Sequence, residues 1–152
     1  MRKTIGMLGL GLLVGALAIG PSIASASSLA PSTTLKLTGQ ATGFQLIEEG
    51  KQGFSLGDRI MLGGVLLQGG KQVGHFGIQD VAVNTQPKQI EEVATFILGG
   101  GQLTFQDMRR TIATDFTVAV TGGTGAYEGA RGEADVHVTK PGSFSVTVHL
   151  IP

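Results

Sequence analysis

Tyr127 and Arg131 are the residues whose types and spacing point most directly to chemistry, because they are the large side chains in a glycine-rich stretch. Five glycines lie among the eleven residues 122–132, which predicts a tight chain reversal. A guanidinium and a phenol at such a corner could orient an oxygen-rich ligand and stabilise charge on it. The alternative is structural, with Arg131 bonding turn carbonyls or Glu133 while Tyr127 packs under the turn.

Further candidate acids and bases lie in the first two thirds of the chain. Asp58 follows a Ser-Leu-Gly turn and could act as an acid or an acceptor at the mouth of a cavity, although an aspartate there also caps its own turn. His75, Asp80 and Glu92 could form an acid/base set. However, His75 and Asp80 are separated by an odd number of residues, so an unbulged strand sends them to opposite faces.

Several familiar kinds of site are missing from the sequence. There is no cysteine, no Ser-His-Asp spacing and no nucleophile elbow. His75, His137 and His149 are spread over three predicted strands, so we expect no metal site. The glycines also look like the start of a dinucleotide-binding fold, but that motif needs a helix after it, and here a strand pattern with period two follows.

The elements that must position these residues are strands. Apolar or small residues alternate with polar ones from Thr34 onward, and short turns rich in glycine or proline interrupt the pattern at regular intervals. Outside the N-terminal segment no stretch of ten residues has a convincing helical period. The predicted strands are Thr34–Gly43, Arg59–Gln68, Gln72–Asn84, Gln89–Leu98, Gln102–Gln106, Thr111–Thr121, Glu133–Thr139 and Ser143–Ile151.

Eight sequential strands with no covering helix predict an all-β, eight-stranded antiparallel up-and-down β-barrel, lipocalin-like in shape, because closure removes exposed sheet edges. The interior of a barrel this size is filled by side chains or holds one small ligand. We expect such a ligand to contact Phe44, Phe76, Phe96 and His75.

The first 26 residues have the order of a secretory signal peptide: a basic start, an apolar run and a small-residue cleavage site that ends at Ala26. The predicted domains are therefore a signal peptide at 1–26, a flexible leader at 27–33 and a barrel at 34–152. We expect the mature protein to be secreted and to have no stable membrane anchor. The mature chain would carry 11 − 2 = 9 basic residues against 11 acidic ones. This balance is unlike that of a nucleic-acid-binding protein.

Four stretches resemble the allene oxide cyclase and dirigent superfamily in order and rough spacing: 54–58, 71–74, 101–106 and, most specifically, 119–133. The resemblance implies a small barrel, commonly a homotrimer, with a hydrophobic cavity open at one end. It also implies chemistry without a cofactor. Members of the superfamily close rings as isomerases or steer the stereochemistry of coupling reactions.

Carry-over from the superfamily is partial. Arg131 matches an arginine that lines the cavity in dirigent proteins, whereas Ala126 and Gly64 replace polar residues of relatives, which argues against allene oxide cyclase activity as such. Two functions follow. The first is a secreted barrel that binds a small hydrophobic molecule and steers its cyclisation or coupling, with Arg131, Asp58 and Tyr127 as catalytic residues. The second is a non-catalytic binding or structural barrel that has lost the site. A cavity with two or more buried polar side chains favours the first, and a barrel plugged by apolar side chains favours the second.

Overall fold

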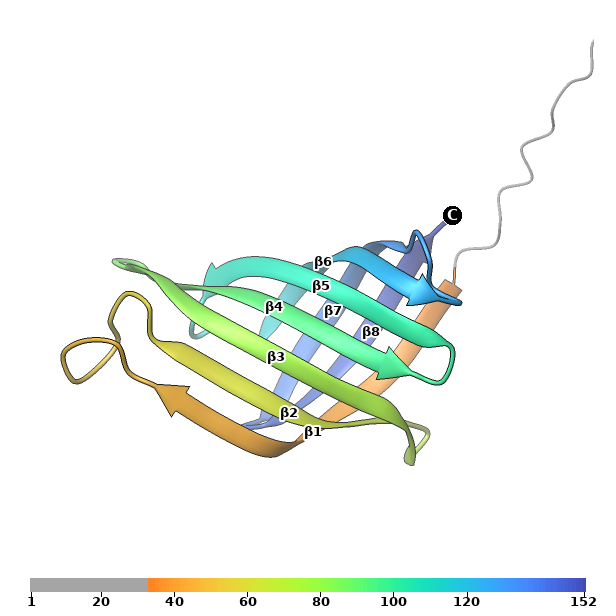
Figure 1. Ribbon diagram of the computed structural model, residues 1–152, viewed down its shortest axis with the longest axis horizontal. Helices are drawn as coiled ribbons and strands as arrows, with labels where there is room; N and C mark the ends of the chain where they lie inside the picture. Colours follow the sequence, from red (N-terminus) through yellow and green to blue (C-terminus); the bar gives the residue numbers. More distant parts are fainter. Residues whose placement is uncertain (1–32) are drawn as a thin grey trace, which may run out of the picture.

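The computed structural model describes residues 33–152, in which eight antiparallel strands form a closed barrel in simple sequential order (Figure 1). The predicted all-β barrel is thereby confirmed. The predicted signal peptide and most of the leader, residues 1–32, lie outside the described residues. No helix in the described part of the chain has the length and apolar character to cross a bilayer. The strands are β1 (Thr33–Ile47), β2 (Arg59–Gln68), β3 (Lys71–Thr85), β4 (Lys88–Leu98), β5 (Gly101–Arg110), β6 (Asp115–Gly125), β7 (Arg131–Lys140) and β8 (Ser143–Ile151).

The strand bounds match the predicted ones to within about two residues, except at the ends of β1, β5 and β6. β5 continues to Arg110 because it stays paired with β4 after it has parted from β6, whose register with β5 ends at Gln106 and Ala119. The predicted start of β6 at Thr111 is wrong, since residues 111–114 form the turn between the two strands. β1 likewise runs on to Ile47, along β2.

One end of the barrel is closed by packed side chains and tightly spaced backbone. Leu66, Leu103 and Val148 are completely buried there. The glycine-rich stretch 122–132 forms the hairpin between β6 and β7 at this end. Gly132 has φ of 139°, and a Cβ added to it would overlap the carbonyl oxygen of His149. The high glycine content is therefore explained by close approach of neighbouring strands.

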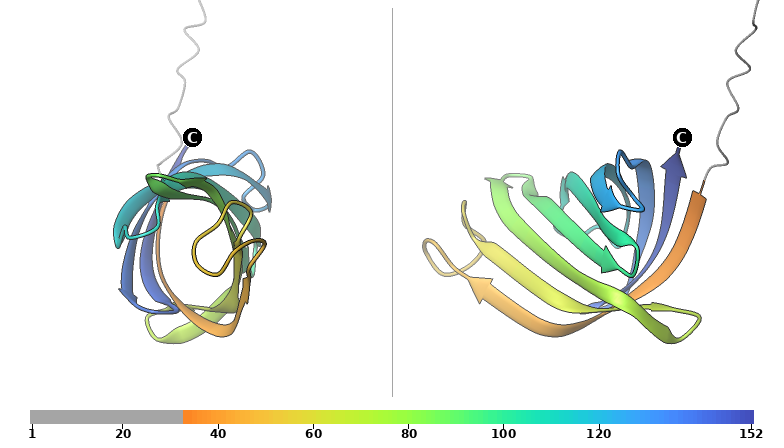
Figure 2. Two further views of the ribbon diagram at one scale, coloured as in Figure 1. Left: turned by 90° about the vertical axis from the view of Figure 1, so that its left-hand side faces the viewer. Right: turned by 45° about the vertical axis from the view of Figure 1, so that its right-hand side comes forward.

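The other end is open and carries the longest loop, residues 48–58, between β1 and β2. Figure 2 (left) looks at the barrel from this side, with the loop hanging across the end. Asp58 holds the loop in shape: its Oδ1 accepts a hydrogen bond from the Glu49 amide at 2.8 Å, and its Oδ2 accepts one from the Ser55 amide at 2.7 Å. The carboxylate thus ties both sides of the loop to the start of β2.

Candidate functional site

The open half of the barrel encloses a cavity of about 500 Å³. Six of the seven phenylalanines of the chain line it: Phe54, Phe76, Phe96, Phe105, Phe116 and Phe144. The rings support one another, with an edge-on contact between Phe76 and Phe144 at 5.1 Å and a tilted one between Phe96 and Phe105 at 4.6 Å between centroids. The size and the lining are those of a pocket for a small apolar molecule.

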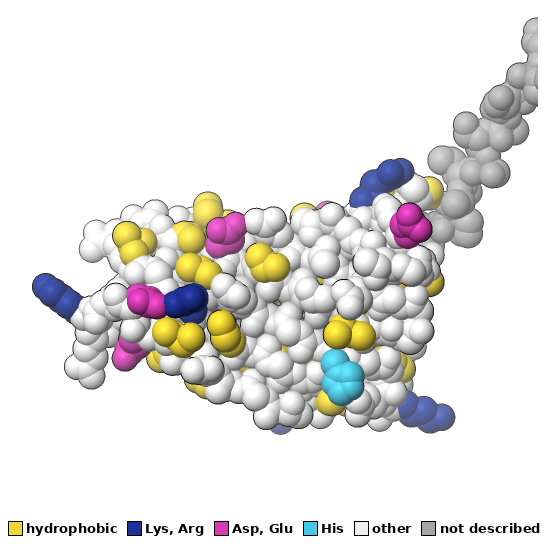
Figure 3. Space-filling view, viewed as in Figure 1, with side chains coloured by type: hydrophobic (Ala, Val, Ile, Leu, Met, Phe, Trp, Pro, Cys, Tyr) yellow, Lys and Arg dark blue, Asp and Glu magenta, His cyan; other side chains and the backbone are white. Residues whose placement is uncertain are grey.

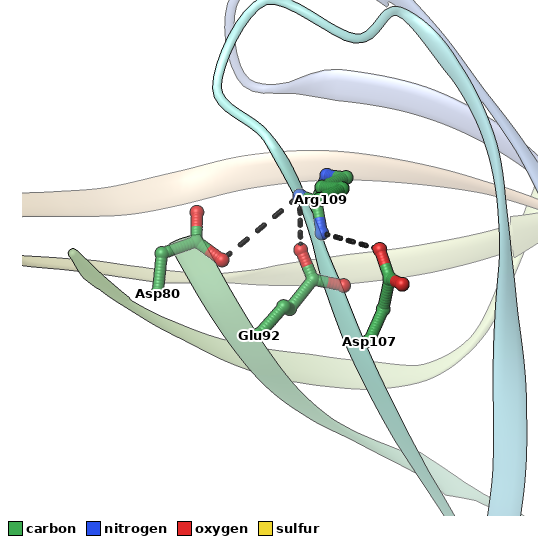
Figure 4. A network of polar contacts seen from close by, with 4 residues as sticks. All are labelled: Asp80, Glu92, Asp107 and Arg109. Carbon is green, nitrogen blue, oxygen red and sulfur yellow. Dashed lines mark hydrogen bonds and ion pairs between the residues drawn. The ribbon is translucent and has the colours of Figure 1, made fainter. Parts of the chain in front are cut away.

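Charged side chains on β3, β4 and β5 meet on one side of this cavity (Figure 4). Asp80, Glu92 and Asp107 occupy one cross-strand row, and Arg109 follows Asp107 on the same face of β5. The Arg109 guanidinium donates to Glu92 at 2.6 Å and to Asp107 at 3.3 Å, and it lies 4.0 Å from Oδ1 of Asp80. It also covers the ring of Phe116 at 3.8 Å from the centroid.

Asp80 is the group of this cluster whose protonation is most perturbed. The residue is 8% exposed. Burial, together with the negative charge of Glu92, raises the pKa of Asp80 from 3.8 to about 7, although the positive charge of Arg109 opposes the shift. Its Oδ1 is buried and has no hydrogen-bond partner. A carboxyl group that titrates near neutral pH in an apolar cavity can act as a general acid and, once ionised, as a general base.

A second cavity of about 250 Å³ adjoins the first. Phe54 of the long loop and Asp80 line both cavities, while Leu46, Glu48 and Asp58 line only the smaller one. Ile60 and Ile90 also line both, so the two spaces share a wall and Asp80 is presented to each of them.

Of the residues predicted to contact a ligand, Phe76 and Phe96 line the main cavity. His75 is exposed and lies outside the lining, because its neighbour Phe76 faces inward and successive strand residues alternate. Phe44 is 66% exposed and also lies outside the lining. It belongs to the part of β1 that pairs with β2 but not with β8, so no strand covers it on the other side.

The three predicted catalytic residues are not brought together. Asp58 borders the smaller cavity, where its carboxylate fixes the loop. Arg131 and Tyr127 lie at the closed end, outside the lining of either cavity. Arg131 is exposed and donates to the carbonyl oxygen of Pro152, and Tyr127 packs against the core. Tyr127 therefore packs as the structural alternative expects, whereas Arg131 bonds Pro152 and neither a turn carbonyl nor Glu133.

Arg109 is the residue that sequence reasoning missed. Of the acid/base set considered from the sequence, Asp80 and Glu92 do meet at the cavity, whereas His75 lies on the opposite face of β3, as the odd spacing predicts. A signal was present: on three neighbouring strands the inward alternation changes from apolar to charged toward one end. Because the predicted strand ended at Gln106, Arg109 lay outside every predicted strand and could not be assigned to the inner face. Within residues 33–152 no group of three or more His, Asp and Glu side chains has the arrangement of a metal site.

No protein-family model matches the sequence, and no curated protein matches it. Solved structures do. A pyocyanin demethylase is 26% identical, with a TM-score of 0.72, over 78% of this chain and 99% of the other. A pterocarpan synthase dirigent protein is 19% identical, with a TM-score of 0.60, over 79% and 88%. A Diels-Alderase from Streptomyces koyangensis is 11% identical, with a TM-score of 0.64, over 85% and 72%. The resemblance to the dirigent and cyclase barrels is thus confirmed at the level of the fold.

Proposed function

We propose that this barrel binds a small, largely apolar molecule in its main cavity and steers its cyclisation or coupling, with proton transfer at Asp80 as the step that serves cyclisation. The observation that carries the proposal is the placement of Asp80, Glu92 and Arg109 on one side of a cavity otherwise walled by phenylalanine. A cavity with buried charged side chains is expected of a barrel that binds or converts a ligand. A non-functional barrel would instead have its interior filled by apolar side chains.

The chemistry follows from the surroundings of the carboxyl group. The aromatic walls hold a reactive molecule in one conformer and keep water away from it. Asp80 can donate a proton to an oxygen or carbon atom of the ligand as a ring closes, and can take a proton back from another position. Such a shift leaves the oxidation state of the molecule unchanged, so it needs no co-reactant. The guanidinium of Arg109, 4.0 Å from Oδ1 of Asp80, offsets part of the charge that develops when Asp80 ionises, because it is also bonded to Glu92 and Asp107.

The solved neighbours support this class of activity. They include proteins named as a pterocarpan synthase, a Diels-Alderase and a pyocyanin demethylase. Each of these names denotes a reaction on a small organic molecule. Since the two ring-forming proteins are less than 20% identical to this chain, we take from them the type of scaffold and leave the substrate open.

The proposal can be tested with 5-nitrobenzisoxazole, whose ring N–O bond breaks to give a coloured cyanophenolate when a base removes its carbon-bound proton. We expect saturable turnover that rises with pH through about 7, as Asp80 ionises. The Asp80→Asn variant should lose at least about tenfold in rate. Asp135→Asn is the matched control, since Asp135 lies on the outer face of β7 with its side chain 59% exposed.

A second arm separates binding from catalysis. The neutral dye N-phenyl-1-naphthylamine fluoresces in apolar cavities, and we expect it to bind the wild-type protein. Ala94→Phe, which fills the cavity, should block both binding and turnover, whereas Val93→Phe on the outer face of the same strand should block neither. Dye binding without base-catalysed turnover would favour the non-catalytic binding barrel.

We also propose that the protein is exported, with residues 1–26 removed, and that it assembles as a homotrimer. Exposed apolar side chains on the outer face of β4 and β5, Val93, Ile97 and Met108, support an interface with a second copy, and apolar side chains gather over this face in Figure 3. Native mass spectrometry of protein from culture supernatant tests both points. The mass expected is three times that of residues 27–152.

A further inference from the structure

We propose that the ligand of the main cavity is a cation, namely a flat aromatic molecule that carries a positive charge on its ring system. This inference rests on the ligand-binding part of the proposed function and adds the charge of the ligand to it. It is carried by the imbalance between carboxyl groups and cationic groups around the cavities, and by the pairing of Arg109 with two carboxylates of its own cluster.

The charged side chains that line the two cavities are predominantly acidic. In residues 33–152, Asp80 and Glu92 line the main cavity, and Glu48 and Asp58 line the smaller one beside it. Arg109 is the one cationic side chain in either lining. Lys88 stands nearby, but its ammonium group lies over the Phe54 ring at 5.5 Å and outside both linings.

The charge of Arg109 is already matched. Its two terminal nitrogens are bound to Glu92 and Asp107, and its flat face rests on Phe116. The cluster of Asp80, Glu92, Asp107 and Arg109 therefore has a net charge of −1 with Asp80 protonated and −2 with Asp80 ionised, counting the other two carboxyl groups as ionised. An anionic ligand would meet this excess negative charge at short range in an apolar setting, where repulsion is strong.

Within this cluster, Asp80 is the carboxyl group with a buried oxygen that accepts no hydrogen bond, its contact with Arg109 being a longer one of 4.0 Å. It is 8% exposed, its Oδ1 accepts no hydrogen bond, and the residue lines both cavities. A buried polar atom left without a partner costs free energy. A positive charge in the cavity would relieve that cost and would also favour the ionised carboxylate, which burial and Glu92 now disfavour.

The remaining walls suit the rest of such a ligand. Phenylalanine rings present electron-rich faces, and a cation near them is attracted by each ring. Six rings border the space. Lys88 and Arg109 lie over the rings of Phe54 and Phe116. In residues 33–152, the lining rings without a cation of the protein over them are Phe76, Phe96, Phe105 and Phe144. A flat cation can therefore stack on the aromatic walls and direct its positive region toward Asp80 and Glu92, whereas a neutral molecule of the same shape gains only the stacking.

Three probes of nearly equal shape test the inference by fluorescence titration at pH 8: 10-methylacridinium, which is permanently cationic, acridine, which is uncharged at this pH, and anthracene-9-carboxylate. We expect the cation to bind at least about tenfold more tightly than acridine, and the carboxylate to bind most weakly. Displacement of N-phenyl-1-naphthylamine by each probe locates it in the cavity.

The pH dependence and two variants complete the test. Affinity for 10-methylacridinium should rise as pH increases through about 7, with proton release detectable by calorimetry in buffers of different ionisation enthalpy. Affinity for the carboxylate should not rise. Asp80→Asn, which has nearly the shape of the protonated acid, should weaken the cation preference and remove its pH dependence, and Asp135→Asn should change neither.

The outcomes separate this inference from the proposed function. Equal or weaker binding of the cation relative to acridine, or a cation affinity independent of pH, overturns the inference while base-catalysed turnover of 5-nitrobenzisoxazole still supports the proposed function. Failure of all three probes and of the neutral dye to bind overturns both. A cation affinity that is unchanged in Asp80→Asn, or that still rises through pH 7 in this variant, contradicts the assignment of Asp80.

Discussion

The two ends of the barrel are built from the same eight strands but are stabilised in opposite ways. At the closed end, Leu66, Leu103 and Val148 are fully buried and the strands approach closely at glycine. At the open end the interior is hollow, and the buried groups include Asp80 and Glu92. Dense packing stabilises the fold, whereas buried carboxyl groups oppose it unless they are paired. The difference indicates that the closed end supports the fold and that the open end holds the candidate site.

The inner face of the barrel changes from apolar to charged side chains between one cross-strand row and the next. Along the inner face of β3, β4 and β5, one cross-strand row consists of Phe76, Phe96 and Leu103, and the row two residues further consists of Ile78, Ala94 and Phe105. The next row consists of Asp80, Glu92 and Asp107. A ligand in the cavity would thus touch aromatic walls and acids at the same time, without any change in the strands that hold them.

The largest expected effect is at the closed end, in Gly132→Ala. The new Cβ would overlap the His149 carbonyl in a backbone conformation that alanine rarely adopts, so we expect a loss of stability on the order of 4 kcal/mol. Denaturant unfolding measures it. The control is Gly77→Ala, where an added Cβ meets nothing within 4 Å. Similar losses in the two variants would contradict the close packing assigned to this end.

Truncating a leucine at each end tests the packing difference directly. Leu103→Ala removes a fully buried side chain, and we expect a loss of about 3 kcal/mol. Leu62→Ala removes a partly buried side chain that already borders the cavity, so the loss should be about half as large. The two variants are compared by urea unfolding at one pH. An equal cost at both positions would show that the open end is packed as densely as the closed end.

Asp80→Asn should stabilise the protein by an amount that grows as pH rises from about 4 to about 7 and is complete above pH 7. Because the folded-state pKa of Asp80 is raised to about 7 from 3.8, the folded protein binds more protons than the unfolded chain between these values. The stability associated with this proton is fully present below the unfolded-state pKa and is lost as pH rises through 7. A tenfold difference in proton affinity between the two states corresponds to about 1.4 kcal/mol. Solvent entering the cavity reduces the total, so we expect a gain on the order of 2 kcal/mol.

Urea unfolding of wild type and Asp80→Asn at pH 5 and at pH 8 measures this gain. The exposed Asp115, whose pKa is lowered chiefly by its hydrogen bond with His137, titrates alike in both proteins and cancels in the difference. A gain of the same size at both pH values would mean that Asp80 is ionised at pH 5, and the proton-transfer role would lose its basis.

The barrel could be predicted from the sequence because its signals are local. The turns at Gly69-Gly70 and Pro141-Gly142 fix the C-terminal end of β2 and the N-terminal end of β8, and alternation defines the strands between turns. Alternation alone separates two faces without identifying the inner one. Charged residues such as Asp80 and Arg109 are normally assigned to the outer face. Their meeting depends on the register of three strands, and that register is shifted by a bulge between Ala82 and Asn84.

The glycine-rich stretch shows the opposite case, in which a conspicuous pattern has a structural cause. Its glycines let β6 approach β5 and let β7 approach β8, and Arg131 and Tyr127 follow them to the closed end. Spacing alone could not distinguish a corner from a cavity wall, because both place large side chains beside small ones.

The smallest expected effect is that of Arg131→Ala. Its side chain is exposed and donates to the Pro152 carbonyl at the C-terminus, so we expect less than about 1 kcal/mol of lost stability and unchanged turnover of 5-nitrobenzisoxazole. Unfolding and turnover are measured on the same preparation. Asp80→Asn serves as the control variant in which turnover is expected to fall. Unchanged stability with lost dye binding or lost turnover would place a ligand at the closed end. In that case the division between a supporting end and a reactive end would fail, because the residue that matches the dirigent arginine would be acting on the ligand from the packed side of the barrel.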